Sequence, residues 1–311
     1  MQSTTQSRHT DTYQCITDIV IAALERGEIP WRRSWTDPIA GLPQNLNTRK
    51  PYKGWNRFYL SWMSALYKFT TPYFLTFRQT QLLGGHIKKG STGFPIVKWV
   101  SPSRPTADDD DTRKRKCLFP ITHFVFSADQ TEGIPLPQSA LVTPSTASRI
   151  QRCEAIIAGM LHPPVIIEGK YDPAYFCLLD QITMPAFRNF NPPEEYYSTL
   201  FHEMIHSTGH PKRLNRKELT HSLGRHSPEY AREELTAEMG AAFLCGITGV
   251  GSKTIDNSAA YVQSWLSNLQ DDKKLVLIAA ARAQAAADHI LNESSSSGET
   301  IDDTDSSTAD R

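Results

Sequence analysis

Apolar residues recur along this chain at two different spacings. Apolar positions three and four apart in runs of ten or more residues predict amphipathic helices, whereas short runs rich in Val, Ile and aromatic residues predict strands. Helices are predicted over 15–26, 56–69, 145–160, 193–208, 228–246 and 257–291. Strands are predicted over 73–77, 86–90, 94–100 and 117–127, and short apolar segments suited to a small sheet occur at 164–169, 175–179 and 182–184. The chain is therefore predicted to be an α+β protein.

The order of these elements divides the chain into two domains. The N-terminal domain mixes helices and strands, and the C-terminal domain carries the small sheet and the longest helices. A proline-containing segment between them is typical of a linker, and three polar or charge-rich stretches that have too little apolar surface for a core are predicted to be disordered. The predicted boundaries are 12–135 and 146–291 for the domains, 136–145 for the linker, and 1–11, 101–116 and 292–311 for the disordered stretches.

The composition excludes several classes of protein. The chain has 311 residues, which is enough for two hydrophobic cores. Its five cysteines form no CxxC pair, which argues against a disulfide framework or a cysteine-rich zinc finger and fits a reducing compartment. No apolar run approaches the ~20 residues that span a bilayer, and the first residues contain no apolar signal segment. We therefore expect a cytoplasmic protein that has no membrane partner.

The charge is balanced overall but unevenly distributed. Lys and Arg total 33 and Asp and Glu total 33, yet residues 1–100 contain 13 basic and 5 acidic residues, a net charge of +8. Residues 38–107 contain no acidic residue. Charge separated in this way indicates an anionic partner for the N-terminal part and says little about the fold.

The segment TLFHEMIHSTGH, residues 199–210, contains the pattern HExxH. On a helix, His202 and His206 lie one turn apart on the same face, so both can direct a ring nitrogen at one metal ion, with Glu203 beside them. Two imidazoles, an open coordination position and a carboxylate that accepts a proton from water are the components of a zinc hydrolase site. The pattern predicts one Zn²⁺ per chain, or another divalent metal, on His202 and His206, with Glu203 as the catalytic base.

A third metal ligand has to come from another segment. The metzincin pattern would place a histidine at position 212, where this chain has Lys212, so we reject that pattern. The helix predicted over 228–246 offers Glu234 and Glu238, four residues apart on an alanine-rich face. We predict Glu234 as the third ligand and Glu238 as the acceptor that orients one of the histidines. Glu233 is the alternative ligand.

Aromatic and basic residues are interleaved in the N-terminal domain. Five of the six tryptophans fall within residues 31–99, among many Lys and Arg side chains. A protein that binds single-stranded DNA combines cations along the phosphates with aromatic faces that stack on bases, and segment 45–57 has this composition in what is predicted to be a loop. For the aromatic residues inside predicted helices and strands we expect core packing instead. The candidate DNA contacts are Arg32, Arg33, Arg49, Lys50, Tyr52, Lys53, Trp55, Arg57, Lys88 and Lys89.

Longer motifs in both halves are shared with a known family. In the first half they are IPWRRSW, NLNTRKPYKGWN, GGHIKKGSTGFPIV and FVFSADQTEGI, and in the second half EEYYSTLFHEMIHSTGHPKRLNR and YAREELTAEMGAAFLC. These motifs resemble the ArdC family of antirestriction proteins, which is related to the N-terminal parts of TraC-type plasmid primases. The resemblance covers residues 12–290. It implies an N-terminal single-stranded-DNA-binding domain, a zincin-like metallopeptidase domain that binds a metal, and protection of incoming DNA from restriction.

These observations favour one function and leave two alternatives open. The favoured function is that of a mobile-element protein that binds entering single-stranded DNA and shields it from host restriction, with a gluzincin-like metal site. The first alternative is a metalloprotease that cleaves a protein partner, such as a restriction component. The second is a DNA-binding protein with a purely structural metal. Glu203 argues against the second, because a closed structural site has no use for a carboxylate beside an open position. Whether the peptidase site is active stays open at this point.

Overall fold

The computed structural model of the chain describes residues 11–32, 41–100, 119–137, 145–220, 227–251 and 258–293. The predicted disordered loop 101–116 lies outside the described residues. So do all but the last residue of segment 1–11 and all but the first two residues of segment 292–311.

The N-terminal part combines a four-stranded sheet, a two-stranded sheet and three helices in the described residues. Its helical segments are α1 (Thr12–Glu25), η1 (Pro30–Arg32), α2 (Gly54–Tyr67), α3 (Phe77–Leu82) and η2 (Ala128–Gln130). Its strands are β1 (Gln44–Asn45), β2 (Tyr73–Leu75), β3 (His86–Ile87), β4 (Phe94–Val100), β5 (Phe119–Ser127) and β6 (Thr131–Glu132). The larger sheet has the order β1-β2-β5-β4, in which only β1 and β2 are parallel, and β3 pairs with β6. Helix α2 packs against β4.

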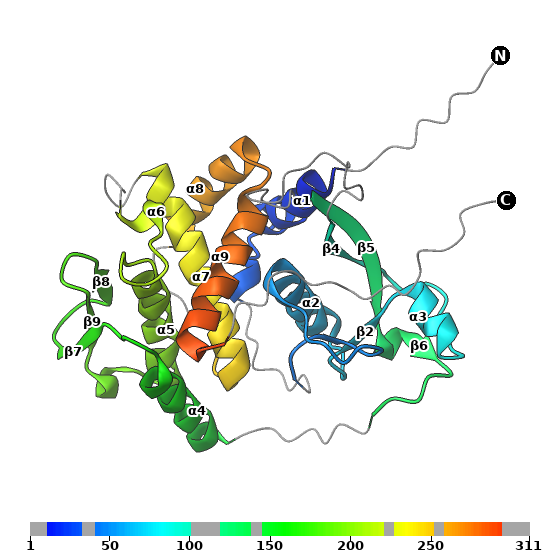
Figure 1. The fold of residues 1–311 in the computed structure, drawn as a ribbon, viewed down its shortest axis with the longest axis horizontal. Coiled ribbons are helices and arrows are strands. Elements are labelled where there is room, and N and C mark those ends of the chain that lie inside the picture. Colours follow the sequence, from blue (N-terminus) through cyan, green and yellow to red (C-terminus); the bar gives the residue numbers. More distant parts are fainter. Residues whose placement is uncertain are drawn as a thin grey trace, which may run out of the picture.

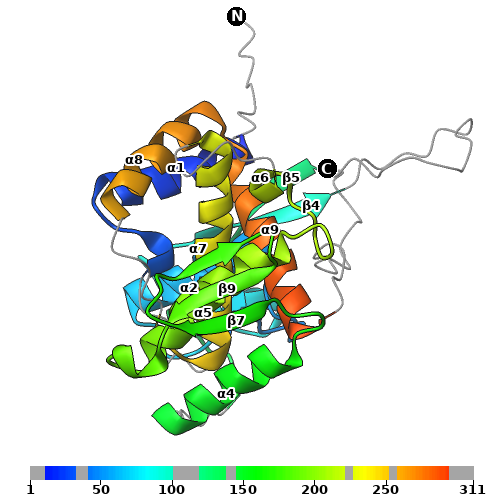
Figure 2. The same cartoon turned by 90° about the vertical axis from the view of Figure 1, so that its left-hand side faces the viewer.

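The C-terminal part is mostly helical. Its helical segments are α4 (Thr146–Gly159), η3 (Phe187–Asn189), α5 (Glu194–Thr208), α6 (Lys217–Thr220), α7 (Pro228–Thr248), α8 (Ser258–Asp271) and α9 (Leu275–Leu291). The strands β7 (Val165–Gly169), β8 (Ala174–Phe176) and β9 (Gln181–Pro185) form a sheet in the order β7-β9-β8, with β7 parallel and β8 antiparallel to β9. Helix α5 packs on β8 and β9, so the sheet lies over this helix, as Figure 2 shows. Helix α7 is central and packs against α5, α6, α8 and α9.

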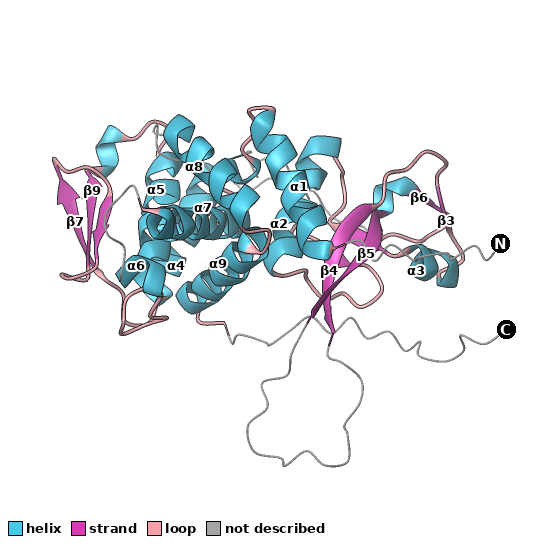
Figure 3. Ribbon diagram, turned by 90° about the horizontal axis from the view of Figure 1, so that it is seen from above, coloured by secondary structure: helices cyan, strands magenta, loops and turns pink. Residues whose placement is uncertain are grey.

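The helices occupy the middle of the molecule, and the β7–β9 sheet lies at one end (Figure 3). Strands β4 and β5 lie on the other side of the helices, with α3, β3 and β6 beyond them at the opposite end. Helix α9, near the end of the chain, packs against α7 and also against α1 and α2 of the N-terminal part (Figure 1). The Trp31 ring lies 5.0 Å from the ring of Trp265 on α8 and 6.3 Å from that of Phe58 on α2. One cluster of buried apolar side chains includes residues of both parts. Burial of apolar surface therefore fixes the two parts to each other.

The predicted α+β class is confirmed, and the structure corrects the strand predicted over 73–77. Strand β2 ends at Leu75, because Thr76 is the N-cap of helix α3, which begins at Phe77. The Thr76 hydroxyl accepts a hydrogen bond from the Gln79 amide, and the Gln79 side chain accepts one from the Thr76 amide. This reciprocal capping box stabilises the start of a short helix that the hydrophobic pattern did not predict.

The prediction of a single helix over 257–291 is also wrong. The structure has two helices there, α8 and α9, separated at residues 272–274. The Lys274 amide donates to the Asp272 side chain and the Leu275 amide donates to the Asp272 carbonyl. An aspartate side chain that bonds the backbone two residues later forms a turn in place of a continuing helix.

Candidate metal centre and DNA-binding surface

Helix α5 carries both histidines of the HExxH pattern on its buried side. Glu194 and Glu195 lie in its first turn, where negative charge interacts favourably with the helix dipole, and Gly209 follows its last residue. His202 and His206 are only 2% and 5% exposed, and their Nε2 atoms lie 3.1 Å apart. The i, i+4 spacing therefore brings the two ring nitrogens together inside the protein, as the sequence predicts.

Helix α7 approaches α5 very closely. A Cβ atom on Gly240 would lie 2.7 Å from Cδ1 and 2.9 Å from Cγ1 of Ile205 on α5, distances that a close-packed interior does not accommodate. Ala237 and Ala241, on the same helix, are buried. Small residues in α7 thus let its backbone come near enough to α5 to add donor groups to the two histidines.

Three donor groups converge between these helices. The carboxylate oxygens of Glu234 lie 3.5 Å from Nε2 of His202 and 3.3 Å from Nε2 of His206. One donor atom from each of the three side chains lies within 4.8 Å of the others, and all three side chains are buried. Two imidazoles and one carboxylate form the protein donor set of catalytic zinc sites, which keep a further position open. The residues present therefore fit a divalent transition-metal ion.

The metal-free site favours protonated imidazoles. Burial by itself would lower the pKa of His206, but Glu234 and Glu233 outweigh it and raise that pKa to about 10. Burial likewise opposes the charged form of His202, yet its hydrogen bond to Glu234 and the charges of Glu234 and Glu203 raise its pKa. The pKa of Glu234 is lowered well below its usual value, because the neighbouring imidazolium groups outweigh its burial.

These pKa values predict that metal binding releases protons. A metal needs the neutral imidazole, so at pH 7 an ion has to displace protons from the two histidines, and apparent affinity should rise as pH increases towards about 10. The stability of the metal-free fold depends on pH in the opposite direction and falls as pH rises. Protonated His206 stabilises the metal-free fold fully below its unfolded pKa of about 6.5, and this contribution is lost as pH rises through about 10.

Calorimetric titration with Zn²⁺ in buffers of different ionisation enthalpy measures this release. We expect about one to two protons per ion at pH 7. An observed binding enthalpy that is the same in every buffer would contradict the expected proton displacement.

Glu203 lies beside the converging donors. It follows His202 on α5, is 4% exposed, and carries a charge that acts on the imidazole of His202. The converging donor set found among the described residues does not include it. A carboxylate in this position is available to exchange a proton with a water molecule at the site.

The carboxylate that orients His206 is Glu233, so the prediction of Glu238 in this role is wrong. Oε1 of Glu233 lies 3.2 Å from Nδ1 of His206. Nδ1 of His202 has no hydrogen-bond partner in the part of the chain that the structure describes, so Glu238 does not orient that ring either. Arg216 donates to both oxygens of Glu233. From the sequence, Glu233 was considered only as an alternative metal ligand, because it is adjacent to Glu234.

Comparisons with known proteins agree with this arrangement. A family model described as the N-terminal domain of anti-restriction factor ArdC matches residues 10–126, and one described as a zincin-like metallopeptidase matches residues 152–282. A crystal structure of the antirestriction protein ArdC from plasmid R388 in its metal-free form has a TM-score of 0.71 and 34% identity, over 91% of this chain and 99% of that one. The chain belongs to the ArdC family of antirestriction proteins.

Other relatives of this ArdC-family protein extend the comparison. The uncharacterized protein y4eC of Sinorhizobium fredii (strain NBRC 101917 / NGR234) is 31% identical over 90% of this chain and 91% of its own length. DNA primase TraC of Escherichia coli is 31% identical over 90% of this chain, but the chain spans only 27% of that primase. The Mn(II)-bound structure of R388 ArdC has a TM-score of 0.70 and 34% identity, over 91% of this chain and 97% of that one. Together with the donor set of His202, His206 and Glu234, these matches make this a divalent-metal site.

The motif NLNTRKPYKGWN is a folded turn in this ArdC-family protein, not the open loop that its composition predicted. The Asn45 side chain accepts a hydrogen bond from the amide of Thr48 and donates to Oε1 of Gln79. Gly54 begins α2, and its amide donates to the side chain of Gln284 on α9. The polar residues of the motif therefore hold the chain in place and connect α2 to the C-terminal part.

Three residues predicted to contact DNA are buried, and that prediction is wrong for them. Tyr52, Trp55 and Arg57 are 3%, 4% and 7% exposed. The Trp55 ring stacks on Tyr59 with centroids 5.3 Å apart, and the Arg57 guanidinium lies 5.9 Å from the ring centroid of Phe243 on α7. Trp55 and Arg57 lie in the first turn of α2, which contacts the C-terminal part, and the Tyr52 ring packs against Phe74 with centroids 6.4 Å apart. These three side chains are therefore not available to stack on bases.

The other predicted DNA contacts have different placements. Arg33 and the side chain of Arg32 lie outside the described residues. The remaining basic residues lie at the surface: Arg49, Lys50, Lys88 and Lys89 are exposed and Lys53 is partly exposed. Within the described part of the chain, no helix combines the length and apolarity needed to cross a bilayer.

The sequence did not identify which aromatic residues are exposed, and Phe77 and Phe124 are among those at the surface of the N-terminal part. Phe77, the first residue of α3, is 55% exposed, and Phe124 on β5 is 56% exposed. Successive side chains of a strand point to opposite faces, so the buried Val125 implied that Phe124 points away from the core. That alternation was the signal that could have identified Phe124.

Proposed function

We propose that this ArdC-family protein binds single-stranded DNA with its N-terminal part, holds Zn²⁺ with His202, His206 and Glu234, and protects DNA that enters with a mobile element from host restriction. The observation that carries the proposal is that one chain joins the buried three-donor site to a region matching the N-terminal domain of anti-restriction factor ArdC. The absence of acidic residues from positions 38–107 supports a polyanionic partner.

Zinc is proposed because the site offers two imidazoles and one carboxylate, the donor set of zinc enzymes that keep one position open. Nitrogen and oxygen donors also bind other first-row ions, and a relative is described as Mn(II)-bound. When bound, such an ion supplies Lewis-acid activation of water or of a carbonyl. Glu203 is the side chain placed to exchange the proton in that chemistry.

The proposed DNA surface lies at the end of the molecule where α3, β3 and β6 lie next to β5 (Figure 3). Helix α3 packs against β3 and β5. It carries the exposed Phe77, while Phe124 lies on β5 and the exposed Lys88 and Lys89 follow β3. This part therefore supplies exposed rings and cations, the two features that single-strand binding requires. None of its helices presents a row of cations suited to a duplex groove within the described residues, so we propose a preference for single strands.

A salt series tests the DNA proposal. The double variant Lys88→Ala/Lys89→Ala should flatten the dependence of log affinity on log salt by about one to two units, because two phosphate contacts are lost. Fluorescence polarisation of labelled single-stranded and duplex oligonucleotides with the full chain, with and without a metal chelator, measures this. Lys170→Ala/Lys212→Ala, which removes two exposed lysines of the C-terminal part, is the matched control. Equal affinity for both forms of DNA, or an equal slope change in the control, would contradict the proposal.

A second candidate function is cleavage of a protein partner, such as a restriction component. The observation that favours it is the buried Glu203 next to His202, since a purely structural metal needs no such group. In this alternative the DNA-binding part brings the peptidase to its substrate.

Glu203→Gln separates the two functions. The variant should keep its metal and fold, because Glu203 is not among the converging donors, but lose any peptide hydrolysis by about 10²–10⁴-fold. We expect protection of incoming DNA to persist, since the N-terminal part supplies it. Metal content and the efficiency of DNA transfer into a restricting host give the two measurements. Loss of protection with metal retained would favour the peptidase instead.

A further inference from the structure

Arg216 is a buried arginine in the segment that follows α5. Its side chain is 6% exposed and donates two hydrogen bonds to Glu233, from Nε to Oε2 at 2.9 Å and from Nη2 to Oε1 at 2.5 Å. Nη1 donates to the hydroxyl of Thr208 at 2.6 Å, and Nη2 donates to the carbonyl of Ile205 at 2.7 Å. Removing a guanidinium from water costs several kcal/mol unless it is well paired, so these bonds commit the side chain to one position.

Glu233 connects Arg216 to the proposed metal ligands. It is 1% exposed, and both of its carboxylate oxygens accept hydrogen bonds from the Arg216 guanidinium, which can only donate. An ionised carboxylate only accepts hydrogen bonds, so Nδ1 of His206 has to donate its proton to Oε1 across the 3.2 Å contact. When the ring is neutral, as metal binding requires, its lone pair is therefore on Nε2, the atom that faces His202 and Glu234.

We propose that Arg216 is a positioning residue of the metal centre, because it holds the Glu233 carboxylate that sets the tautomer and orientation of His206. This inference rests on the proposed function, in which His202, His206 and Glu234 bind the metal. Arg216 acts through Glu233 and is not one of the three proposed ligands. Outer partners of metal-binding histidines of this kind typically contribute about 10–100-fold to metal affinity.

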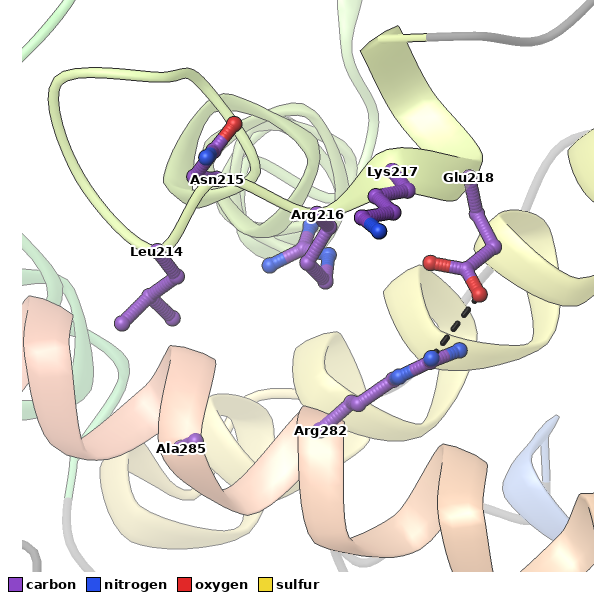
Figure 4. A pocket seen from close by; sticks show the side chains of 7 residues that line it. All are labelled: Leu214, Asn215, Arg216, Lys217, Glu218, Arg282 and Ala285. Carbon is purple, nitrogen blue, oxygen red and sulfur yellow. Dashed lines mark ion pairs between the residues drawn. The ribbon is translucent and has the colours of Figure 1, made fainter.

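The surroundings of Arg216 allow the side chain to be changed. Figure 4 shows Arg216 in the wall of a pocket of about 360 Å³ between residues 214–218 and α9. An ion pair of 2.8 Å between Glu218 and Arg282 holds α6 to α9 at this pocket. Water in the pocket can fill the space left by a shorter side chain. Arg216→Lys is therefore expected to fold, but a lysine lacks the planar fork that grips both carboxylate oxygens.

A double-mutant cycle tests the proposal. Zn²⁺ and Mn²⁺ dissociation constants are measured by chelator competition for the wild type, Arg216→Lys, Glu233→Gln and the double variant. Each single variant should weaken metal binding by about 10–100-fold. The double variant should be weakened by much less than the product of the two single effects, because Arg216 acts on the His206 ring through Glu233. The visible spectrum of the Co²⁺-loaded protein should change in the same variants, since the His206 ring loses its fixed orientation.

Arg213→Lys is the matched control. Arg213 lies in the same segment, its side chain is 2% exposed, and it pairs with Asp180 and donates to the carbonyl of Ser207, away from both imidazoles. Its replacement should leave metal affinity and the Co²⁺ spectrum unchanged. Gly209→Ala is a second route to the same test, because its Cβ would lie 2.8 Å from Cδ2 of Leu219 and 3.1 Å from Nη2 of Arg216, so it crowds the guanidinium without removing a charge. It should weaken metal binding less than Arg216→Lys does.

The outcomes separate this inference from the proposed function. Wild-type affinity in both Arg216→Lys and Gly209→Ala, additive effects in the cycle, or an equal loss in Arg213→Lys would overturn the positioning role while leaving the metal site intact. A His206→Ala variant that binds metal as tightly as the wild type would overturn the metal site and the positioning role together. Tenfold or greater weakening that disappears in the Glu233→Gln background, with the Arg213→Lys control unaffected, is the result that establishes Arg216 as a positioning residue.

Discussion

Replacement of His206 by alanine is expected to leave this ArdC-family protein unable to retain a divalent metal. The ring supplies one of three converging donors, and its loss leaves His202 and Glu234 as the remaining members of the donor set found among the described residues. The metal content of protein purified with Zn²⁺ should fall from about one ion per chain to near zero, and His202→Ala should behave in the same way. A bound ion also stabilises the folded state. At a metal concentration a hundredfold above the dissociation constant, losing it should lower the free energy of unfolding by about 2.7 kcal/mol.

The two neighbouring glutamates should differ sharply in the same measurement. Glu234→Ala removes a carboxylate that faces both Nε2 atoms and should lose the metal. Glu233→Ala removes no predicted ligand but takes away the acceptor behind His206 and the partner of Arg216, and should weaken binding by about 10–100-fold. His210→Ala, which changes a nearby histidine outside the donor set, is the control. Metal analysis after gel filtration compares the variants. If Glu233→Ala loses more metal than Glu234→Ala, the third ligand is Glu233 and not Glu234.

The geometry of the HExxH segment was predictable because it depends on one helix alone. Helix periodicity places His202 and His206 on one face, and the acidic first turn and Gly209 bound the helix from both sides. The third donor was harder to predict, because it depends on how two helices pack. Its helix was recognisable from its small residues, yet the rotation of α7 against α5 decides which of three glutamates faces which nitrogen. Gly240 fixes that contact through its approach to Ile205, and its role is visible only in three dimensions.

The DNA-binding surface shows a different limit of the sequence. Composition alone cannot separate an aromatic residue that stacks on a base from one that packs in a core, because both need a large flat ring. The segment 45–57 looked exposed because it is polar and contains Gly and Pro. Its polarity instead serves internal hydrogen bonds, such as those of Asn45, and its Gly54 starts a helix that docks on α9. The prediction missed this because both partners are distant in sequence.

Replacement of Trp55 by alanine is expected to destabilise the whole fold and leave DNA contacts of the folded protein unchanged. Trp55 is 4% exposed, and its ring stacks on Tyr59 and lies 5.7 Å from Phe58, so truncation leaves a cavity in the cluster that joins the two parts. The free energy of unfolding should fall by about 3–5 kcal/mol. Chemical denaturation followed by circular dichroism, at fixed metal and DNA concentrations, measures the change.

Phe124→Ala is the matched aromatic variant, and it is expected to weaken DNA binding while leaving the stability of the fold nearly unchanged. Phe124 is 56% exposed, so its loss should change the free energy of unfolding by no more than about 0.5 kcal/mol. If its ring stacks on a base, single-stranded DNA binding should weaken by about 1–3 kcal/mol, with a nearly unchanged salt dependence because no cation is removed. The pair of variants therefore separates the two roles an aromatic side chain can have here. Weaker DNA binding by folded Trp55→Ala, with unchanged stability, would show that Trp55 contacts DNA after all. Full DNA affinity in Phe124→Ala would show that Phe124 does not contact DNA.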